Sequence, residues 1–271
     1  ATAATGDLDR AETTAHAITH PYQQAWALAG LAQAIAATGD LDRAETTAHA
    51  ITHPDQQARA LAGLAQAIAA TGDLDRARRL TTAAETTARA ITHPYGQVEA
   101  LTGLAEAIAA TGDLDRARTL TTTAETTARA ITHTYQQAQA LAHLARAIAA
   151  TGDLDRAETT ARTITHSYQQ AWALADLAEA IAATGDLDRA EATARTITDP
   201  CWQAQALARL AQLPIVLADS TRARRLLALA LSIGKWTESL AGLAVVEPAA
   251  VGPIADEICA RWSRREDDRS G

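Results

Sequence analysis

The stretch Thr38-Gly39-Asp40-Leu41-Asp42-Arg43-Ala44 decides the fold of this chain, because the same string occurs six times. Its copies are spaced 33, 33, 40, 40 and 33 residues apart and begin at Thr5, Thr38, Thr71, Thr111, Thr151 and Thr184. A period of roughly 20 to 50 residues is typical of a chain built from stacked structural repeats. Such an array presents a long surface rather than a single pocket. The sequence therefore indicates the architecture and the class of activity, but it does not identify a partner.

Within this string, the local turn residues predict the start of a helix. Gly39 suits the left-handed residue that follows a helix, and Asp40 is a preferred N-cap. Asp42 adds negative charge near the positive end of the helix dipole, and Arg43 can pair with Asp40 on the helix surface. We therefore expect a helix, called helix B in every repeat, over about Leu41–Thr52.

A second helix, called helix A, is expected from Pro54 to about Ala70. His53 should leave the α conformation because it precedes Pro54, and proline is well tolerated in the first turn of a helix. The apolar positions of this helix are three and four residues apart, which is typical of an amphipathic helix. They are Leu61, Leu64 and Ile68, with alanines beside them.

Applied along the chain, this pattern predicts an all-α fold of about 15 antiparallel helices. Helix B occurs seven times, the last time in a degenerate form that keeps Asp219 and Arg222, and helix A occurs six times. Two further helices are expected over Trp236–Val246 and Pro248–Trp262. The expected organisation is repeats over 1–233, divergent capping helices over 234–262 and a charged tail over 263–271, since terminal repeats are atypical. The chain opens inside a repeat, so we expect it to be cut from a longer protein.

Two of the repeats are 40 residues long and carry seven extra residues, which are 78–84 and 118–124. Seven residues make nearly two helical turns, so the buried face drifts by only ~20°. We therefore expect these residues to lengthen helix B by roughly 10 Å rather than to form loops.

The composition narrows the function classes. The apolar share is 48% but the aromatic share is 3%, so the core must consist of closely packed Ala- and Leu-rich helices. The net charge of -8 argues against nucleic-acid binding and fits a neutral or basic protein partner. Cys201 and Cys259 suggest no disulfide or zinc framework. Neither a membrane span nor a signal peptide is recognisable, and we expect a cytoplasmic, bacterial protein with no membrane partner.

Motifs that could carry chemistry are weak. The Asp-x-Asp of each turn lacks the distal Glu of a calcium loop, so capping explains it better. The pairs His16/His20 and His49/His53 have a zinc-compatible spacing, but zinc needs three or four ligands. Neither a phosphate loop nor a nucleophile motif is recognisable. We therefore predict no cofactor, no metal and no enzymatic activity.

Most positions are identical between the repeats, but three positions of helix A differ. They are spaced by four and three residues, so they share one helix face with a mostly tyrosine position one turn earlier. We call this set the helix A stripe. Its three positions are occupied by Trp26, Arg59, Glu99, Gln139, Trp172 and Gln205, then by Gly30, Gly63, Gly103, His143, Asp176 and Arg209, and then by Gln33, Gln66, Glu106, Arg146, Glu179 and Gln212; the tyrosines are Tyr22, Tyr95, Tyr135 and Tyr168.

Two interpretations of the stripe remain open. A solvent-facing stripe is free to drift, since single exposed apolar residues are normal. Exposed Trp, Tyr and Arg are, however, the usual hot spots of binding. In the second interpretation the anchors are Tyr22/Trp26 and Tyr168/Trp172, with Arg146 and Glu179 selecting charge. The candidate binding residues are Tyr22, Trp26, Arg59, Tyr95, Glu99, Tyr135, Gln139, His143, Arg146, Tyr168, Trp172, Asp176, Glu179 and Arg209.

Residues 39–44, Gly-Asp-Leu-Asp-Arg-Ala, resemble the inter-helix turn of the tetratricopeptide repeat, a helix-turn-helix unit of 34 residues. The resemblance covers roughly residues 5–233. Leu and Ile stand where that family carries aromatics, the period is 33 or 40, and HEAT-like packing is the nearest alternative. The residues that correspond to the family's helix positions are Leu28, Leu31, Ala32, Ile35 and Ala44.

The resemblance implies a right-handed superhelix that binds peptides or proteins on a concave face lined by helix A, and it implies no catalysis. The leading hypothesis is a protein–protein interaction or scaffold array that forms the C-terminal recognition (sensor) part of a larger multidomain protein. The alternative is a structural spacer or self-assembly module, with a homo-oligomer formed through exposed terminal helices. RNA binding by helical repeats is disfavoured by the acidic charge.

Overall fold

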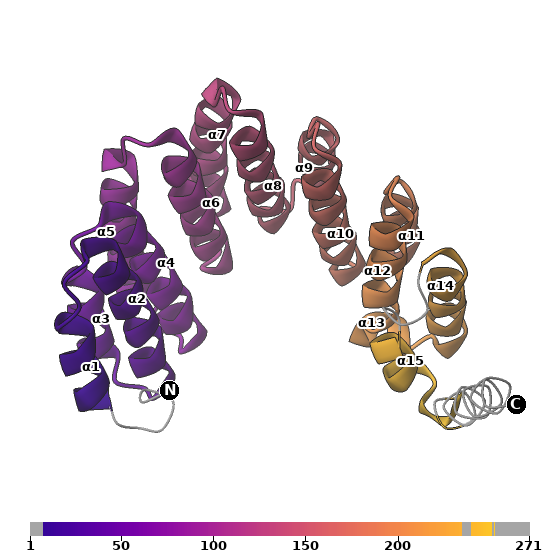
Figure 1. The fold of residues 1–271 in the computed structure, drawn as a ribbon, viewed down its shortest axis with the longest axis horizontal. Coiled ribbons are helices and arrows are strands. Elements are labelled where there is room, and N and C mark those ends of the chain that lie inside the picture. Colours follow the sequence, from indigo (N-terminus) through magenta and orange to yellow (C-terminus); the bar gives the residue numbers. More distant parts are fainter. Residues whose placement is uncertain (1–7, 235–239, 251, 253–271) are drawn as a thin grey trace, which may run out of the picture. The chain divides into compact units, whose positions relative to one another are not determined.

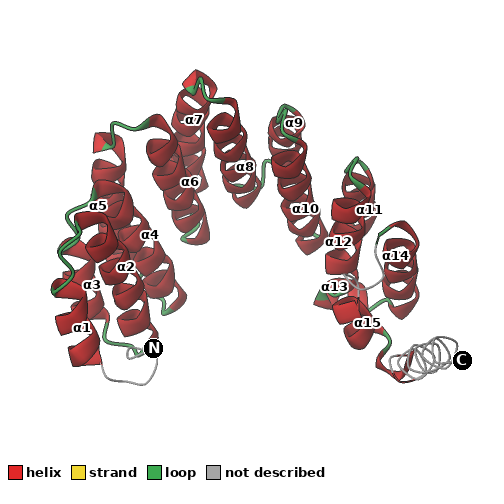
Figure 2. Cartoon of the chain, viewed as in Figure 1, coloured by secondary structure: helices red, strands yellow, loops and turns green. Residues whose placement is uncertain are grey.

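A computed structural model describes residues 8–234, 240–250 and 252, and all the regular secondary structure in this part of the chain is helical. It contains fifteen α-helices, a short 3₁₀ helix and no strand (Figure 2). The all-α prediction is therefore confirmed. Contacts divide the chain into two compact units, Ala1–Ile164 and Thr165–Gly271. They are called unit 1 and unit 2.

In unit 1, helix B and helix A alternate along the chain (Figure 1). Each helix A packs against the helix B that follows it, and each of the first three also packs against the helix A of the next repeat. The helix B copies are α1 (Leu8–His16), α3 (Leu41–His49), α5 (Leu74–Ala90), α7 (Leu114–Ala130) and α9 (Leu154–Arg162), and the helix A copies are α2 (Pro21–Ala37), α4 (Pro54–Ala70), α6 (Pro94–Ala110) and α8 (Thr134–Ala150).

Unit 2 contains two further copies of each helix and a divergent end. The degenerate helix B is confirmed, because Asp219 accepts a hydrogen bond of 3.1 Å from the backbone N–H of Arg222 at the start of its helix. The helices are α10 (Ser167–Ala183), α11 (Leu187–Arg195), α12 (Pro200–Ala211), α13 (Pro214–Leu217), α14 (Ser220–Ile233) and α15 (Leu240–Val246), with a 3₁₀ helix over Pro248–Ala250.

The last helices differ from the prediction. The sixth helix A ends early, at Ala211, because Pro214 lacks a backbone N–H and cannot continue the helix. The short α13 that follows was not expected. Of the two predicted capping helices, the described residues include α15 and the 3₁₀ helix; residues 235–239, 251 and 253–262 lie outside them.

The inter-repeat turns form as predicted. Their glycines have positive φ, from 84° at Gly152 to 93° at Gly185, and therefore occupy the left-handed region. The following Asp caps helix B in every copy from the second onward, as when Asp40 accepts a hydrogen bond of 3.2 Å from the backbone N–H of Arg43. Local sequence is sufficient to specify this turn.

Helix B is shorter than expected in the 33-residue repeats. In α3 it ends at His49 instead of Thr52, and Ile51 leaves the helix to bury its side chain. Gln57 Nε2 in α4 donates a hydrogen bond of 3.0 Å to the carbonyl of His49, which satisfies an acceptor that the helix end leaves open. In the 40-residue repeats α5 and α7 have 17 residues against 9 in α3, so the predicted lengthening is confirmed.

The core is built from the positions that the repeats share. On helix A the side chains of Leu61, Leu64 and Ile68 are buried, and on helix B those of Ala44 and Ala48 are buried. The small alanines allow the helices to approach closely, so the leucines and isoleucines fill the space between them. This packing leaves one face of helix A outside the core.

Candidate binding surface on helix A

The helix A stripe lies on that outer face. Tyr22, Trp26, Tyr135 and Tyr168 are 51%, 66%, 45% and 53% exposed, and Trp172 is half-buried. None of the fourteen predicted binding residues is fully buried, and each is either exposed or partly buried. They are Tyr22, Trp26, Arg59, Tyr95, Glu99, Tyr135, Gln139, His143, Arg146, Tyr168, Trp172, Asp176, Glu179 and Arg209.

In unit 1, ion pairs tie the stripe of one helix A to that of the next. Arg59 on α4 pairs with Glu99 on α6. Arg146 Nε on α8 lies 2.9 Å from Glu106 Oε1 on α6. Arg146 was predicted to select charge in a partner, yet in this structure its charge is matched within the stripe.

Between these pairs the stripe of unit 1 encloses two adjoining hollows of about 290 and 270 Å³. Both are lined by Gln33 and Arg59, so they adjoin and are considered together as one groove. We call this the α2–α8 groove. Its other lining residues are Trp26, Ala27, Ala29, Gly30 and Gln56 in the smaller hollow, and Ala62, Gly63, Gln66, Glu99, Ala100, Thr102, Gly103, Glu106, His143 and Arg146 in the larger one.

Gly30, Gly63 and Gly103 form a row along this groove, and His143 occupies the equivalent position in the next helix A. Burial, together with the positive charges of Arg146 and Arg59, lowers the pKa of His143 from 6.5 to about 4. The imidazole is therefore neutral near pH 7 and adds no charge to the groove.

In unit 2 the stripe residues of α10 contact side chains of α12. Arg209 on α12 pairs with Asp176 and Glu179 on α10, at 3.0 and 2.5 Å. Tyr168 packs edge to face on Trp202, with ring centroids 4.9 Å apart. Glu179, the second predicted charge selector, is therefore paired within the stripe as well.

Helix B carries a regular set of ion pairs that the sequence analysis missed. Arg43 was expected to pair with Asp40, but only its backbone N–H contacts that side chain; its guanidinium lies 2.6 Å from both Glu12 and Asp9 of the previous helix B. We call the equivalent set the Arg–Glu ladder. Its pairs are Arg43–Glu12, Arg76–Glu45, Arg116–Glu85 and Arg156–Glu125.

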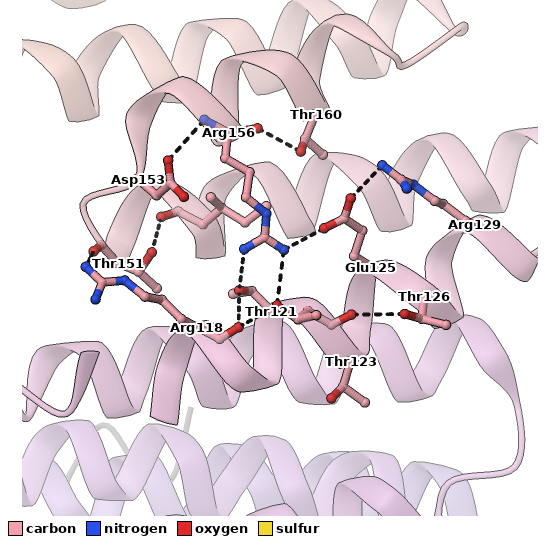
Figure 3. A network of polar contacts seen from close by, with 12 residues as sticks. Arg118, Thr121, Thr123, Glu125, Thr126, Arg129, Thr151, Asp153, Arg156 and Thr160 are labelled. Carbon is pink, nitrogen blue, oxygen red and sulfur yellow. Dashed lines mark hydrogen bonds and ion pairs between the residues drawn. The ribbon is translucent and has the colours of Figure 1, made fainter. Parts of the chain in front are cut away.

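Figure 3 shows one rung of this ladder, in which Arg156 on α9 points at Glu125 on α7. Arg156 Nη2 lies 2.5 Å from Glu125 Oε2, and Glu125 Oε1 lies 2.6 Å from Arg129. Arg156 Nη1 also donates to Thr121 Oγ1 at 3.4 Å. The ladder was detectable, because each of these arginines stands 31 residues after a glutamate in every copy.

A second missed feature is a matched pair in the second and third helix A. Asp55 stands where most copies have tyrosine, and a Cβ at Gly96 would lie 2.8 Å from Asp55 Oδ2. A side chain at Gly96 would therefore force the end of the Asp55 side chain to move. Comparing each copy with the next one, rather than with the consensus, could have found this pair.

The described residues contain no group of three or more His, Cys, Asp or Glu side chains that could hold a metal ion. No helix in the same part of the chain is long and apolar enough to cross a membrane.

The family model of the tetratricopeptide repeat matches five segments, which are residues 25–50, 58–81, 98–121, 138–163 and 171–196. Each match begins in a helix A and ends in the next helix B or one residue after it. The chain is a tetratricopeptide-repeat-like α-solenoid. In this solenoid the second and third matches stop at Thr81 and Thr121, inside the lengthened α5 and α7. The matches favour the tetratricopeptide assignment over the HEAT-like alternative.

Among solved structures, the chain is similar to the crystal structure of Ton1535 from Thermococcus onnurineus NA1. The TM-score is 0.41 at 14% sequence identity, and the alignment covers 91% of this chain and 97% of that chain. A comparison with curated proteins finds no match.

Proposed function

We propose that this array is a protein-interaction scaffold that binds an extended or helical segment of a partner protein through the helix A stripe. Tetratricopeptide repeats generally mediate protein–protein interaction or scaffolding. The observation that carries the proposal is the contrast between positions. Residues that the repeats share form the core and the Arg–Glu ladder, whereas residues that differ lie on the exposed stripe.

The strongest anchor in this proposal is the aromatic pair on α2. Trp26 is 66% exposed, and Tyr22 beside it packs edge to face on His53 of the next repeat at 5.4 Å. Aromatic side chains bring a large apolar area with few rotatable bonds, so covering them contributes strongly to affinity. Tyr168 and Trp172 are the corresponding anchor in unit 2.

The context of the array is part of the proposal. By analogy with other repeat arrays, we infer a recognition (sensor) region of a larger, cytoplasmic bacterial protein. The acidic net charge of -8 supports a neutral or basic protein partner over a nucleic acid.

The test is a capture experiment with matched variants. Proteins retained by the immobilised chain are identified and then compared with those retained by Trp26→Ala, Trp172→Ala and the control Thr119→Ala, which changes an exposed residue of α7. We expect each tryptophan variant to weaken the binding of a specific partner by roughly 2 kcal/mol or more, with an unchanged circular dichroism spectrum. A partner that binds all variants equally would contradict the proposal. Concentration-dependent self-association without a partner would favour a self-assembly module instead.

A further inference from the structure

One residue that lines the α2–α8 groove carries a buried hydrogen-bond acceptor that the described part of the chain does not satisfy. Gln56 on α4 is 5% exposed and lines the hollow beside Trp26 and Gly30. Its Oε1 is buried and has no hydrogen-bond partner among the described residues. Leaving a buried acceptor unpaired is unfavourable. A ligand that donates a hydrogen bond at this point would remove that penalty.

The floor of the groove is made of glycines that packing does not require. Gly30, Gly63 and Gly103 lie inside helices, where glycine is less favourable than alanine. A Cβ at Gly30 or Gly103 would meet no described atom within 4 Å, and at Gly63 it would make one ordinary contact of 3.5 Å with Gln33. Gly96 is different, because a Cβ there would lie 2.8 Å from Asp55 Oδ2 and the Asp55 side chain would have to move. The missing side chains of the floor therefore leave space that a partner can enter.

The walls of the groove are neutral as a whole. Two arginines and two glutamates line it, and they pair as Arg59–Glu99 and Arg146–Glu106. A charged segment entering the groove would have to break one of these pairs or remain unpaired in a partly desolvated site. Gln33 and Gln66 offer both donors and acceptors, as a peptide backbone does.

We propose, on the basis of the proposed function, that the α2–α8 groove binds an extended and uncharged peptide segment of small residues. One large apolar side chain of that segment packs on Trp26. A backbone N–H of the segment donates to Gln56 Oε1, while Gly, Ala or Ser residues lie over the glycine floor. Neighbouring packed helices are about 8–10 Å apart, so the floor spans about 20 Å over α2, α4 and α6. An extended chain rises about 3.3 Å per residue, so the segment has about six residues.

The probe is a set of synthetic nonapeptide pools applied to the immobilised chain. The neutral pools contain random Gly, Ala and Ser with one leucine fixed at each position in turn, and their ends are blocked. Two comparison sets replace two of the small residues with Asp or with Lys. We expect the best neutral pool to be retained at least about tenfold more than either charged set, as mass spectrometry can quantify. Equal or stronger retention of a charged set, or no retention of any pool, would overturn the proposal.

Two variants locate the binding to the groove. Gly63→Leu fills the floor in a helix interior, and Gln56→Leu removes the unpaired acceptor. We expect both variants to retain at least tenfold less of the neutral pool than the unchanged chain does. Their thermal unfolding temperature should be equal to that of the unchanged chain or higher. Thr119→Leu, which adds the same side chain on the exposed face of α7, should retain the peptides as the unchanged chain does. Retention that survives in Gly63→Leu would place the peptides elsewhere and overturn the proposal.

The same variants separate this inference from the function on which it rests. If captured partner proteins are lost from Trp26→Ala but retained by Gly63→Leu, the stripe binds proteins and the groove inference is wrong. If neither variant changes the capture of any protein, the proposed function fails as well.

Discussion

The Arg–Glu ladder on helix B and the helix A stripe are both built from side chains on adjacent repeats, yet the copies treat them in opposite ways. In unit 1 the ladder repeats one rung, with Arg side chains 18–30% exposed and each held by the glutamate of the preceding helix B. The stripe changes from tryptophan to arginine to glutamate at a single position and leaves its aromatics largely exposed. Positions that form the core and the ladder stay constant, whereas the stripe positions differ from copy to copy even where they pair across repeats. The comparison of copies within one chain thus separates structural surfaces from candidate recognition surfaces.

The largest expected effect on stability comes from His143, a residue of the stripe. At acidic pH this effect reduces the contrast between the stripe and the ladder. The pKa of His143 is lowered to about 4 in the folded chain, mainly by burial and then by Arg146 and Arg59. Between about pH 6.5 and 4 the unfolded chain therefore binds more protons. The contribution of His143 to stability is complete above pH 6.5 and is lost as the pH falls towards 4, by at most about 3 kcal/mol. Urea unfolding at pH 7.5 and 4.5 should show a smaller loss for His143→Gln than for the unchanged chain, and identical losses would contradict the burial of this imidazole.

The ladder gives the next largest effect. Glu125 is 18% exposed and accepts from Arg156 and Arg129, so Glu125→Ala should lower the free energy of unfolding by about 1–2 kcal/mol. Asp115→Ala is the matched control, because its carboxylate is 97% exposed and pairs with Arg118 on the same helix. We expect less than about 0.5 kcal/mol from the control. Equal losses in chemical denaturation would show that the ladder contributes no more than an ordinary surface ion pair.

Two glycines nine residues apart sharpen the contrast between the turn and the stripe. Gly112 has φ 86° in the turn, so Gly112→Ala should destabilise the chain by ~1 kcal/mol. Gly103 lies inside α6 with open space at its Cβ, so Gly103→Ala should stabilise the chain by about 0.5–1 kcal/mol. The opposite signs can be read from thermal or chemical unfolding. Unchanged stability in Gly112→Ala would show that the turn does not need a glycine. A loss of stability in Gly103→Ala would show that the space at Gly103 is not open.

The fold was predictable from the sequence to the extent that its determinants are local. Gly39 and Asp40 specify the turn within three residues, and proline marks the start of helix A. The end of helix B was missed because Gln57 caps it through space from the next helix. The ladder was missed because Arg43 has an acidic neighbour in its own turn, and only the packing of adjacent helices shows that its guanidinium contacts Glu12 instead.

The candidate surface was predictable in outline for the same reason. Helical periodicity placed the varying positions on one face, which the structure shows to be exposed. The groove depends on the distance between neighbouring helix A copies and on their glycine floor, which no local pattern reports. Gln56 resembled its equivalents in other copies and therefore attracted no notice, although it lines the groove and its buried Oε1 is unpaired.

The central claim, that the stripe serves recognition and the ladder serves stability, is tested most directly by the free energy of unfolding of Trp26→Ala measured beside its retention of a captured partner. Trp26 is 66% exposed, so the account predicts a stability change below about 0.5 kcal/mol together with a loss of at least about 2 kcal/mol in partner affinity. Glu125→Ala, measured in parallel under native conditions, should show the reverse pattern. A Trp26→Ala variant that is destabilised as much as Glu125→Ala, or that binds the partner unchanged, would contradict the claim.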